Sequence, residues 1–483
     1  METREVDVLV IGAGTAGLNA VAELRNTDRD WMLVDSGPLG TTCARVGCMP
    51  SKLLIAAGDR AQAVREAGEF GIDVENFSVD AQAVFSRLRA HRDRFVAGVI
   101  DGMDKLPEDR IIRGLACFSA PSAVQIEREN EAPLRVECRA VVIATGARPT
   151  VPPVFQKVGQ NAWLSDDVFE LDDLPARLAV VGTGAIGLEL GQALQRLGVA
   201  VDFFSNEAFI GPLQDPEIQQ CVRATLSADH RFHLQADIEE AEECEEGGVR
   251  MAWKDRGGQR QVQVFERVLL ATGRVPQIGA LKLENAGLAL DEHGMPVGWD
   301  PCTTQVGSAP IFLAGDVSHH RPLMHEAVDE GRIAGRNAAH YPETSENHRR
   351  TPLAIVFSHP QMAAVGAAFE SLDQGEFETG SVSFANQGRA RVLDANQGTM
   401  RLYAERSSCT LVGAELFGPD AEHLAHLLAW SVQQQLTVKD LLSMPFYHPV
   451  LEEALRTALK DLSRRLDIEE RCRRYEVIVC PGD

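Results

Sequence analysis

The sequence predicts an α/β protein that contains two similar nucleotide-binding domains. The first observation behind this prediction is the length, because 483 residues are too many for one ordinary domain and suit about two to four. The second is a glycine-rich strand-to-helix pattern that occurs at Gly12 and again at Gly182. The third is a strand ending in Ala-Thr-Gly, which also occurs twice, at Ala144 and at Ala271.

The first glycine-rich pattern follows a short, mostly apolar strand at Val6–Ile11 and leads into a helical run through Leu24. In this order the first glycine permits a tight turn, the second lets the backbone approach a pyrophosphate, and the third allows close helix packing. A second strand then ends at Asp35, whose carboxylate is placed to accept hydrogen bonds from ribose hydroxyl groups. The three glycines are Gly12, Gly14 and Gly17.

The second pattern repeats this arrangement after the strand Leu178–Val181. Asp35 lies 23 positions after Gly12, and the same step from Gly182 reaches Ser205, so the second copy lacks the ribose-binding acid. One glycine pattern alone is a weak signal, but two copies in register predict two Rossmann-like domains with one dinucleotide site each. The glycines of the second copy are Gly182, Gly184 and Gly187, and the two Ala-Thr-Gly turns, which close each nucleotide-binding half, contain Thr145, Gly146 and Gly273.

The cysteine pair Cys43 and Cys48 lies just downstream of the first glycine pattern. Two thiols with four residues between them can close a small disulfide, which predicts a redox switch served by the cofactor of the neighbouring loop. Cys48 precedes Pro50 and an apolar run, so it is predicted to open a helix with Lys52 one turn on. A helix N-terminus and a nearby cation both favour a thiolate, so we expect Cys48 to carry the charge and Cys43 to meet the substrate.

A structural zinc site is the alternative explanation for this cysteine pair. Such a site would need two further ligands at similar spacing, whereas the other cysteines before the C-terminal tail stand alone in sequence, so we expect no metal. Ten cysteines are also too few and too scattered for a secreted disulfide framework, and the N-terminus shows no signal-peptide core. These observations indicate the cytoplasm.

The charge balance argues against several classes of partner. With 47 basic and 70 acidic residues the net charge is −23, which disfavours binding to phosphate backbones and anionic membrane surfaces. No stretch approaches the roughly 20 apolar residues that a membrane-spanning helix needs. We therefore expect neither nucleic acid binding nor membrane insertion.

With these motifs the chain resembles the flavoprotein disulfide reductases, the class I pyridine nucleotide-disulfide oxidoreductases, and among them it is most similar to the dihydrolipoamide dehydrogenases. The resemblance covers essentially the whole chain. Besides the cysteine segment and the repeated glycine and Ala-Thr-Gly motifs, it includes Ile311–Asp316, the run from Leu323 to Gly331, and His448-Pro449 with Glu453.

The resemblance implies an FAD-binding domain at residues 1–150 and 274–345, an NAD(P)-binding domain at residues 151–273, and an α+β interface or dimerisation domain at residues 350–483. In similar enzymes two subunits of a homodimer build each active site together. The family's catalytic base and its carboxylate partner match His448 and Glu453, which would act with the two cysteines. The catalytic set implied in this way is Cys43, Cys48, His448 and Glu453.

Two further cofactor contacts also follow from the resemblance. The aspartate matching Asp316 bonds the ribityl chain of the flavin, and the lysine matching Lys52 sits by the flavin ring and pairs with the glutamate matching Glu189. The chain departs from the family at Thr41, where a second glycine is common.

The second departure is Ser205, where NAD-specific members commonly have an acid. Glu207, two positions on, would repel the extra phosphate of NADP, and no Arg or Lys lies between Arg196 and Arg223. We therefore expect NAD, with NADP as the alternative.

The predicted reaction is oxidation of a small or carrier-bound dithiol with reduction of NAD. Dihydrolipoyl groups are the expected substrate, and a lipoyl domain of a 2-oxoacid dehydrogenase complex is one candidate carrier. An NAD(P)H-dependent reductase of another disulfide is the alternative within the enzyme class, and a catalytically inactive nucleotide-binding or assembly subunit is the alternative outside it. The tail carries Cys472 and Cys480, which we expect to be incidental thiols, although some relatives that reduce mercury or thioredoxin use C-terminal cysteines as an electron relay.

Overall fold

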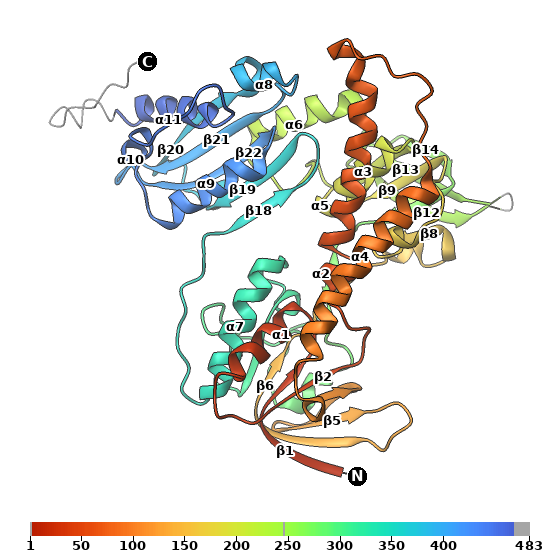
Figure 1. Ribbon diagram of the computed structural model, residues 1–483, viewed down its shortest axis with the longest axis vertical. Helices are drawn as coiled ribbons and strands as arrows, with labels where there is room; N and C mark the ends of the chain where they lie inside the picture. Colours follow the sequence, from red (N-terminus) through yellow and green to blue (C-terminus); the bar gives the residue numbers. More distant parts are fainter. Residues whose placement is uncertain (1, 245–246, 468–483) are drawn as a thin grey trace.

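A computed structural model of the chain describes residues 2–244 and 247–467. These residues form three main sheets with helices packed against them, so the predicted α/β fold class is confirmed (Figure 1). The first sheet and its helices occupy the lower half of the molecule in this view, and the second and third sheets occupy the upper half.

The first sheet has the N-terminal strand β1 (Glu2–Ile11) near its middle, in the order β3-β2-β1-β6-β5-β4, and β17 pairs with β6. β1 pairs in parallel with β2 and β6, and its residues Val8–Ile11 are buried, as expected for a strand covered on both faces. The other strands are β2 (Trp31–Asp35), β3 (Ile111–Arg113), β4 (Leu115–Ala120), β5 (Ala123–Glu127), β6 (Leu134–Ile143) and β17 (Ile311–Leu313).

Two helices, α1 (Thr15–Leu24) and α7 (Met324–His340), pack closely on this sheet. Glycines make the close approach possible, because a Cβ at Gly331 would lie 2.2 Å from the carbonyl oxygen of Ala16. A Cβ at Gly335 would likewise lie 2.5 Å from the carbonyl oxygen of Ala20. The run from Leu323 to Gly331, which resembles the family pattern, therefore falls at the start of α7, the helix that packs closely against α1.

The second sheet is fully parallel, in the order β11-β10-β9-β15-β8, and a three-stranded antiparallel sheet, β12-β13-β14, lies beside it. The chain enters the region of the second sheet through β7 and leaves it through β16, and these two strands pair with each other. The region of the second sheet is therefore an insertion in the region of the first sheet, joined to it by two adjacent connections. The strands are β7 (Ala147–Pro149), β8 (Ala162–Leu164), β9 (Arg177–Val181), β10 (Ala200–Ser205), β11 (Arg231–Leu234), β12 (Asp237–Glu243), β13 (Val249–Lys254), β14 (Arg260–Phe265), β15 (Arg267–Leu270) and β16 (Arg274–Pro276), and the helices are α5 (Ala185–Arg196) and α6 (Pro216–Asp229).

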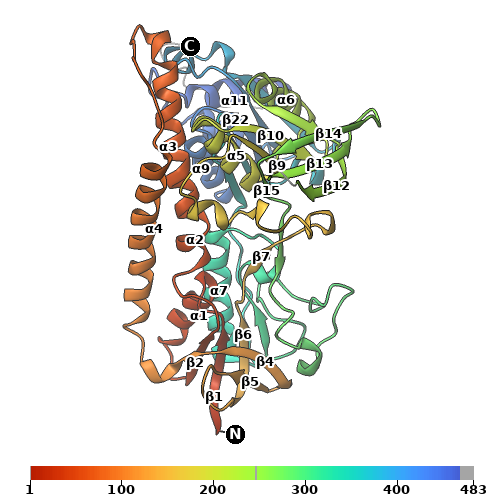
Figure 2. The ribbon, with the colours of Figure 1, turned by 90° about the vertical axis from the view of Figure 1, so that its right-hand side faces the viewer.

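Two long helices, α3 (Cys48–Glu66) and α4 (Ala81–Met103), run side by side along one flank of the molecule (Figure 2). They follow the short helix α2 (Thr42–Arg45). Helix α3 also packs on α5, where a Cβ at Gly58 would lie 3.0 Å from the carbonyl oxygen of Ala193. The helix that Cys48 opens is therefore held against the glycine-loop helix of the second sheet.

The third sheet is antiparallel, in the order β18-β19-β22-β21-β20, with α9 and α11 packed on it around an apolar core. The strands are β18 (Leu353–Val356), β19 (Gln361–Gly366), β20 (Phe377–Ser383), β21 (Thr399–Glu405) and β22 (Leu411–Gly418), and the helices are α8 (Gly388–Val392), α9 (Ala421–Gln433), α10 (Val438–Leu442) and α11 (Glu453–Arg465). Within the described residues, no helix is both long enough and apolar enough to cross a membrane.

Candidate active site

The first glycine loop shapes a cavity of about 520 Å³ at the carboxyl ends of β1 and β2. Gly12 has a φ of +108°, and a Cβ there would lie 2.3 Å from the carbonyl oxygen of Ala144. A Cβ at Gly17 would lie 1.8 Å from the carbonyl oxygen of Gly12, so only glycine allows the helix to start so close to the strand. At Gly14 a Cβ would meet nothing nearer than 4.0 Å, which leaves the loop backbone open to the cavity.

Polar groups in the wall of this first cavity are only partly satisfied by hydrogen bonds within the protein. Asp35 accepts the N–H of Ala13 at 2.6 Å and the N–H of Gly37 at 2.8 Å. Thr145 also lines the cavity, and its buried hydroxyl has no hydrogen-bond partner within the described protein, while the adjacent Gly146 turns the chain with a φ of +69°. Because a buried hydroxyl normally finds a partner, Thr145 marks a place where a bound ligand would supply one.

Asp316 stands one residue beyond the Ala314-Gly315 turn that follows β17 and does not line this cavity. Burial raises the pKa of its carboxyl group, and the positive charge of Arg274 and a backbone hydrogen bond act against that effect. Gly315 donates its N–H to the buried Glu330 at 2.8 Å, which fixes the turn before Asp316.

The second glycine loop shapes a cavity of about 610 Å³ in the same way. Gly182 has a φ of +111°, and a Cβ there would lie 2.2 Å from the carbonyl oxygen of Ala271. A Cβ at Gly187 would lie 2.0 Å from the carbonyl oxygen of Gly182. Each Ala-Thr-Gly turn therefore packs against its own glycine loop, Ala144 against Gly12 and Ala271 against Gly182, which explains why the two motifs repeat together.

The wall of the second cavity is acidic at the end of β10. Ser205 is buried there, and its hydroxyl accepts the N–H of Glu207 at 3.0 Å. Glu207 and Asp237 both line the cavity, and none of the Lys or Arg residues in the described part of the chain does. Within the glycine loop, a Cβ at Gly184 would meet no atom within 4 Å, and Gly273 adopts a φ of +97° in the neighbouring Ala-Thr-Gly turn.

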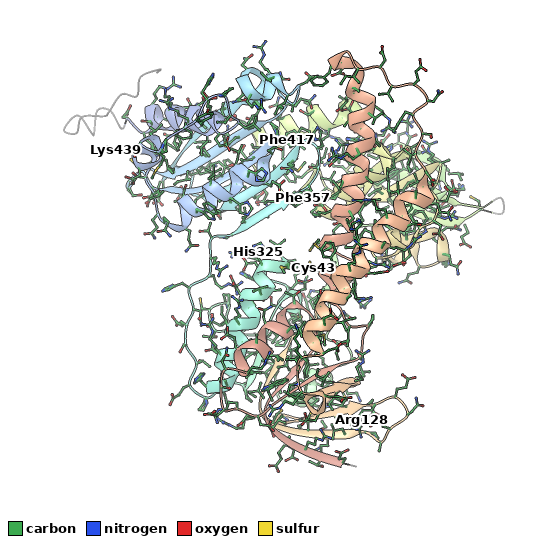
Figure 3. The ribbon with its side chains drawn as sticks, in the orientation of Figure 1. Cys43, Arg128, His325, Phe357, Phe417 and Lys439 are labelled. Atoms are coloured by element: carbon green, nitrogen blue, oxygen red, sulfur yellow. The ribbon has the colours of Figure 1, made fainter. Side chains whose placement is uncertain are left out.

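Cys43 in α2 and Cys48 at the first residue of α3 are free thiols in hydrogen-bonding contact. The Cys43 hydrogen bond is the main cause that lowers the pKa of the Cys48 thiol to about 7, while burial opposes this shift and the charge of Lys52 supports it. The same contact, together with burial, raises the pKa of Cys43. Cys48 is therefore the thiol that carries the charge, and Figure 3 shows Cys43 at the junction between the two halves of the molecule.

Thr41, which stands where similar enzymes commonly have a second glycine, adopts φ 58° and ψ 150°. This backbone region suits glycine and is strained for a β-branched residue. The Thr41 hydroxyl accepts the N–H of Ala44 at 3.3 Å and so caps α2, the helix that carries Cys43. The substitution thus combines backbone strain with a helix cap directly before the cysteine pair.

Lys52 connects three parts of the chain one turn after Cys48. Its ammonium group lies 2.8 Å from a carboxylate oxygen of Glu189 on α5, and Glu189 is only 6% exposed. The other oxygen of Glu189 accepts the N–H of Phe357 at 3.0 Å, and the Phe357 ring centre lies 4.4 Å from the ammonium nitrogen. The sequence did not identify Phe357, because a phenylalanine at a strand end reads as a core residue and carries no signal of a cation contact.

His448, in the segment between α10 and α11, pairs with Glu453, the first residue of α11. The Nδ1 of His448 lies 3.0 Å from Glu453, whose second oxygen accepts the N–H of Val450 at 3.1 Å. Although burial acts to raise it, these hydrogen bonds keep the pKa of Glu453 below its usual value. The His448 side chain is 80% exposed, and α10 and α11 lie far from α2, so one chain does not bring His448 to Cys43 (Figure 1).

Two further expectations concern metals and the C-terminal tail. In the parts of the chain that the structure describes, no group of three or more His, Cys, Asp or Glu side chains gathers in a way that could hold a metal ion. Cys472 and Cys480 lie outside the described residues.

Comparison with known proteins identifies the family to which the chain belongs. Residues 6–331 match the pyridine nucleotide-disulphide oxidoreductase family, and residues 353–459 match its dimerisation domain. The chain is 30% identical over 466 residues to dihydrolipoyl dehydrogenase 2 of Haloarcula marismortui, covering 94% of this chain and 96% of that protein. It is also 30% identical over 453 residues to a dihydrolipoyl dehydrogenase of Bacillus subtilis, covering 93% of this chain and 94% of the relative.

Solved structures show the same fold at lower sequence identity. LpdA from Mycobacterium tuberculosis superposes with a TM-score of 0.80 at 24% identity, covering 94% of this chain and 99% of that chain. The HOCl-induced flavoprotein disulfide reductase RclA from Escherichia coli, in its Cu(II) complex, gives a TM-score of 0.80 at 22% identity, covering 96% and 99%. The chain belongs to the pyridine nucleotide-disulphide oxidoreductases, which use FAD and NAD(P)H.

Proposed function

We propose that this oxidoreductase oxidises dihydrolipoyl groups, free or carried on a lipoyl domain, and reduces NAD. The observation that carries the proposal is the contact between Cys43 and Cys48 at the start of α3, with Lys52 one turn away. A thiol pair with one lowered pKa is the arrangement that thiol–disulfide exchange requires. The curated relatives named dihydrolipoyl dehydrogenase, which match over nearly the whole chain, support this choice of substrate.

Each cofactor is assigned to one glycine loop. FAD would be held by residues 1–150 and 274–345, through the Gly12 loop, Asp35 and the unpartnered Thr145, with Asp316 on the ribityl side. The nicotinamide dinucleotide would be held by residues 151–273, through the Gly182 loop. When bound, FAD supplies the two-electron carrier that connects the nicotinamide to the cysteine pair.

The two cysteines would divide the exchange chemistry between them. A substrate thiolate attacks the sulfur of Cys43 in the Cys43–Cys48 disulfide, so that a mixed disulfide forms and Cys48 leaves as a thiolate. The second substrate thiol then attacks the substrate sulfur of the mixed disulfide, which releases the cyclic disulfide product and the Cys43 thiol. Cys48 suits the leaving role because its pKa is lowered to about 7, and a thiol of low pKa leaves faster.

His448 would remove the proton from the attacking substrate thiol, and Glu453 would orient the imidazole. Because His448 is exposed and distant from Cys43 in its own chain, the base of each site would come from a second copy. The match of residues 353–459 to a dimerisation domain supports a homodimer joined through the proposed interface domain, residues 350–483. One homodimer would then contain two such sites.

The acidic wall of the second cavity supports NAD over NADP. Glu207 and Asp237 would repel the additional phosphate of NADP, and the cavity offers that phosphate no cationic side chain within the described residues. Ser205 leaves the ribose hydroxyls without the usual acid at the strand end, and Glu207 is close enough in sequence to take its place.

Steady-state rates with four substrate and coenzyme pairs test the proposal. We expect dihydrolipoamide with NAD to give a kcat/KM at least tenfold above dihydrolipoamide with NADP, and expect reduction of glutathione disulfide with either reduced coenzyme to be slower still. A higher rate with another disulfide and NADPH would instead establish a reductase of that disulfide. Purification without flavin, or without thiols that a reductant restores, would identify a non-catalytic subunit.

A further inference from the structure

The loop between β10 and α6, residues 206–215, forms one wall of the second cavity. Phe209, Gly211, Leu213 and Gln214 from this loop all line it. The first half of the loop is held by its own domain, since the N–H of Gly211 donates to the carbonyl oxygen of Thr183 at 2.8 Å. The carbonyl oxygen of Leu213 accepts the side-chain N–H of Gln219 on α6 at 2.6 Å, whereas the last two residues, Gln214 and Asp215, are held by side chains from the third sheet.

The side chain of Glu415 on β22 binds the backbone at the end of this loop. Its carboxylate accepts the N–H of Gln214 at 3.2 and 3.0 Å and the N–H of Asp215 at 3.0 Å. Figure 1 shows α6, which begins directly after Asp215, lying against the strands β21 and β22 of the third sheet. A cavity-lining residue of one region is thus fixed by a carboxylate of another.

Asp215, the residue next to Gln214, is fixed from the same sheet. Arg401 donates to its carboxylate at 2.6 Å, and the Tyr403 hydroxyl donates to the same oxygen at 3.0 Å. Arg401 stands directly opposite Glu415 on the neighbouring strand β21, so the sheet register aims both side chains at one loop. The other oxygen of Asp215 accepts the N–H of Glu217 at 2.9 Å and caps α6.

This cluster of four side chains is almost fully enclosed. Asp215 and Tyr403 are 0% exposed, Glu415 is 3% exposed and Arg401 is 9% exposed. The cluster contains two buried carboxylates and one buried guanidinium, and Arg401 forms its ion pairs with Asp215 and with the exposed Glu217. The charges are therefore not balanced inside the cluster. Buried polar clusters of this kind contribute little net stability but fix the geometry of the groups they join.

We infer that Glu415 is a positioning residue for nicotinamide dinucleotide binding: from the third sheet it holds the Gln214 end of the loop in the shape that the second cavity requires. The inference rests on the proposed assignment of this cavity to the nicotinamide dinucleotide. The proposed interface domain would then support the coenzyme site from outside, through Glu415, Arg401 and Tyr403, none of which lines the cavity.

Ionisation of Glu415 places a negative charge on the oxygens that accept the N–H groups of Gln214 and Asp215, which strengthens these hydrogen bonds. Burial raises its pKa to about 7, while the Asp215 and Gln214 N–H groups act against this, Asp215 adds repulsion and Arg401 adds attraction. On its other flank Glu415 pairs across the sheet with Ala364, which carries no charge. Coenzyme affinity is therefore expected to rise as the pH rises through about 7 and Glu415 loses its proton.

The test compares NAD binding by three variants of the oxidised holoenzyme, measured by isothermal titration calorimetry so that no turnover is needed. For Glu415→Gln we expect the Kd for NAD to rise roughly tenfold and to lose its dependence on pH near 7, because the neutral amide offers one acceptor in place of a charged carboxylate. Tyr403→Phe removes one hydrogen bond to Asp215 without changing a charge and should raise Kd roughly twofold to fivefold. Glu378→Gln, which breaks an ion pair with Arg406 elsewhere on the same sheet, serves as the matched control with unchanged Kd.

Two companion measurements separate positioning from a folding defect. In steady state, Glu415→Gln should raise KM for NAD with kcat within about twofold of the wild type, since an interaction made equally in ground and transition states changes KM alone. Burial raises the pKa of Glu415 from its ordinary 4.5 to about 7 in the folded chain, so its ionisation costs stability progressively between about pH 4.5 and pH 7. The thermal midpoint of Glu415→Gln should therefore improve relative to wild type over this interval and keep that gain above pH 7. Weaker coenzyme binding would then accompany undiminished stability.

The outcomes distinguish the inference from the proposed function. If Glu415→Gln and Tyr403→Phe both bind NAD with the wild-type Kd and the wild-type pH profile, the inference is overturned and the proposed function is left intact. A wild-type holoenzyme that binds neither NAD nor NADP would overturn the proposed coenzyme site and the inference with it. A loss of affinity shared equally by Glu378→Gln would show a general effect of the sheet and would also overturn the inference.

Discussion

The charge of Lys52 and the charge of Glu189 are expected to shift the acidity of Cys48 in opposite directions. Lys52 follows Cys48 by four residues on α3, and side chains at that spacing are neighbours about 6 Å apart. For an exposed pair with an effective dielectric constant of about 40 to 80, Coulomb's law gives about 0.7 to 1.4 kcal/mol, or about 0.5 to 1 pKa unit. Lys52→Gln should therefore raise the pKa of Cys48 from about 7 to between about 7.5 and 8.

Glu189→Gln removes a negative charge that raises the pKa of Cys48, so this variant should lower that pKa. The assay is the pH dependence of iodoacetamide alkylation at Cys48, followed by mass spectrometry, in a Cys43→Ser holoenzyme whose serine can still donate a hydrogen bond. Lys157→Gln, which neutralises an exposed lysine on another part of the surface, is the matched control. Shifts of the same sign in Lys52→Gln and Glu189→Gln, or no shift in either, would refute this electrostatic reasoning.

Three further predictions concern the helix cap, the base and the coenzyme. Thr41→Gly should have a higher thermal midpoint than Thr41→Ala, by the equivalent of about 1 to 2 kcal/mol. The reason is that only glycine relieves a backbone strain of about 1 to 3 kcal/mol at this φ. An alanine variant as stable as the glycine variant would contradict the presence of that strain. His448→Gln should lower the rate of dihydrolipoamide oxidation by about 10² to 10⁴-fold. Reduction of the bound FAD by NADH, measured by stopped flow, should be unchanged. Equal loss of both half-reactions would show that His448 is not the substrate base. Glu207→Gln should raise kcat/KM with NADP roughly fivefold by removing one repulsive charge from the cavity wall, and an unchanged NADP rate would place the phosphate-discriminating group elsewhere.

Much of the fold was predictable because glycine motifs report backbone conformation directly. At Gly12 and Gly182 a Cβ would collide with the carbonyl oxygen of an Ala-Thr-Gly turn, so the residue type and the turn are physically linked. The same holds for Cys48, whose place before Pro50 predicted a helix start that the structure shows at Cys48 itself. These signals are local, which is why one sequence is enough to read them.

Contacts between distant parts of the chain could not be predicted from such local sequence signals. Phe357 meets Lys52, and Glu415 meets Gln214, only because three sheets pack together, and nothing in the neighbouring residues marks either side chain. The position of His448 illustrates the other limit, because an exposed histidine distant from Cys43 gains a role in the proposed mechanism only from a second copy of the chain.

The central claim is that Cys48 supplies a thiolate beside the flavin when the Cys43–Cys48 pair is reduced. Anaerobic titration of the purified holoenzyme with two electrons, followed by absorption spectroscopy, tests this claim most directly. We expect a long-wavelength thiolate-to-flavin absorption band in the wild type after two electrons have been added. Cys43→Ser, whose Cys48 is already a free thiol, should show the band before any reductant is added, and Cys48→Ser should lack it in both states. Simple bleaching of the flavin spectrum in the wild type, with no such band, would contradict the claim.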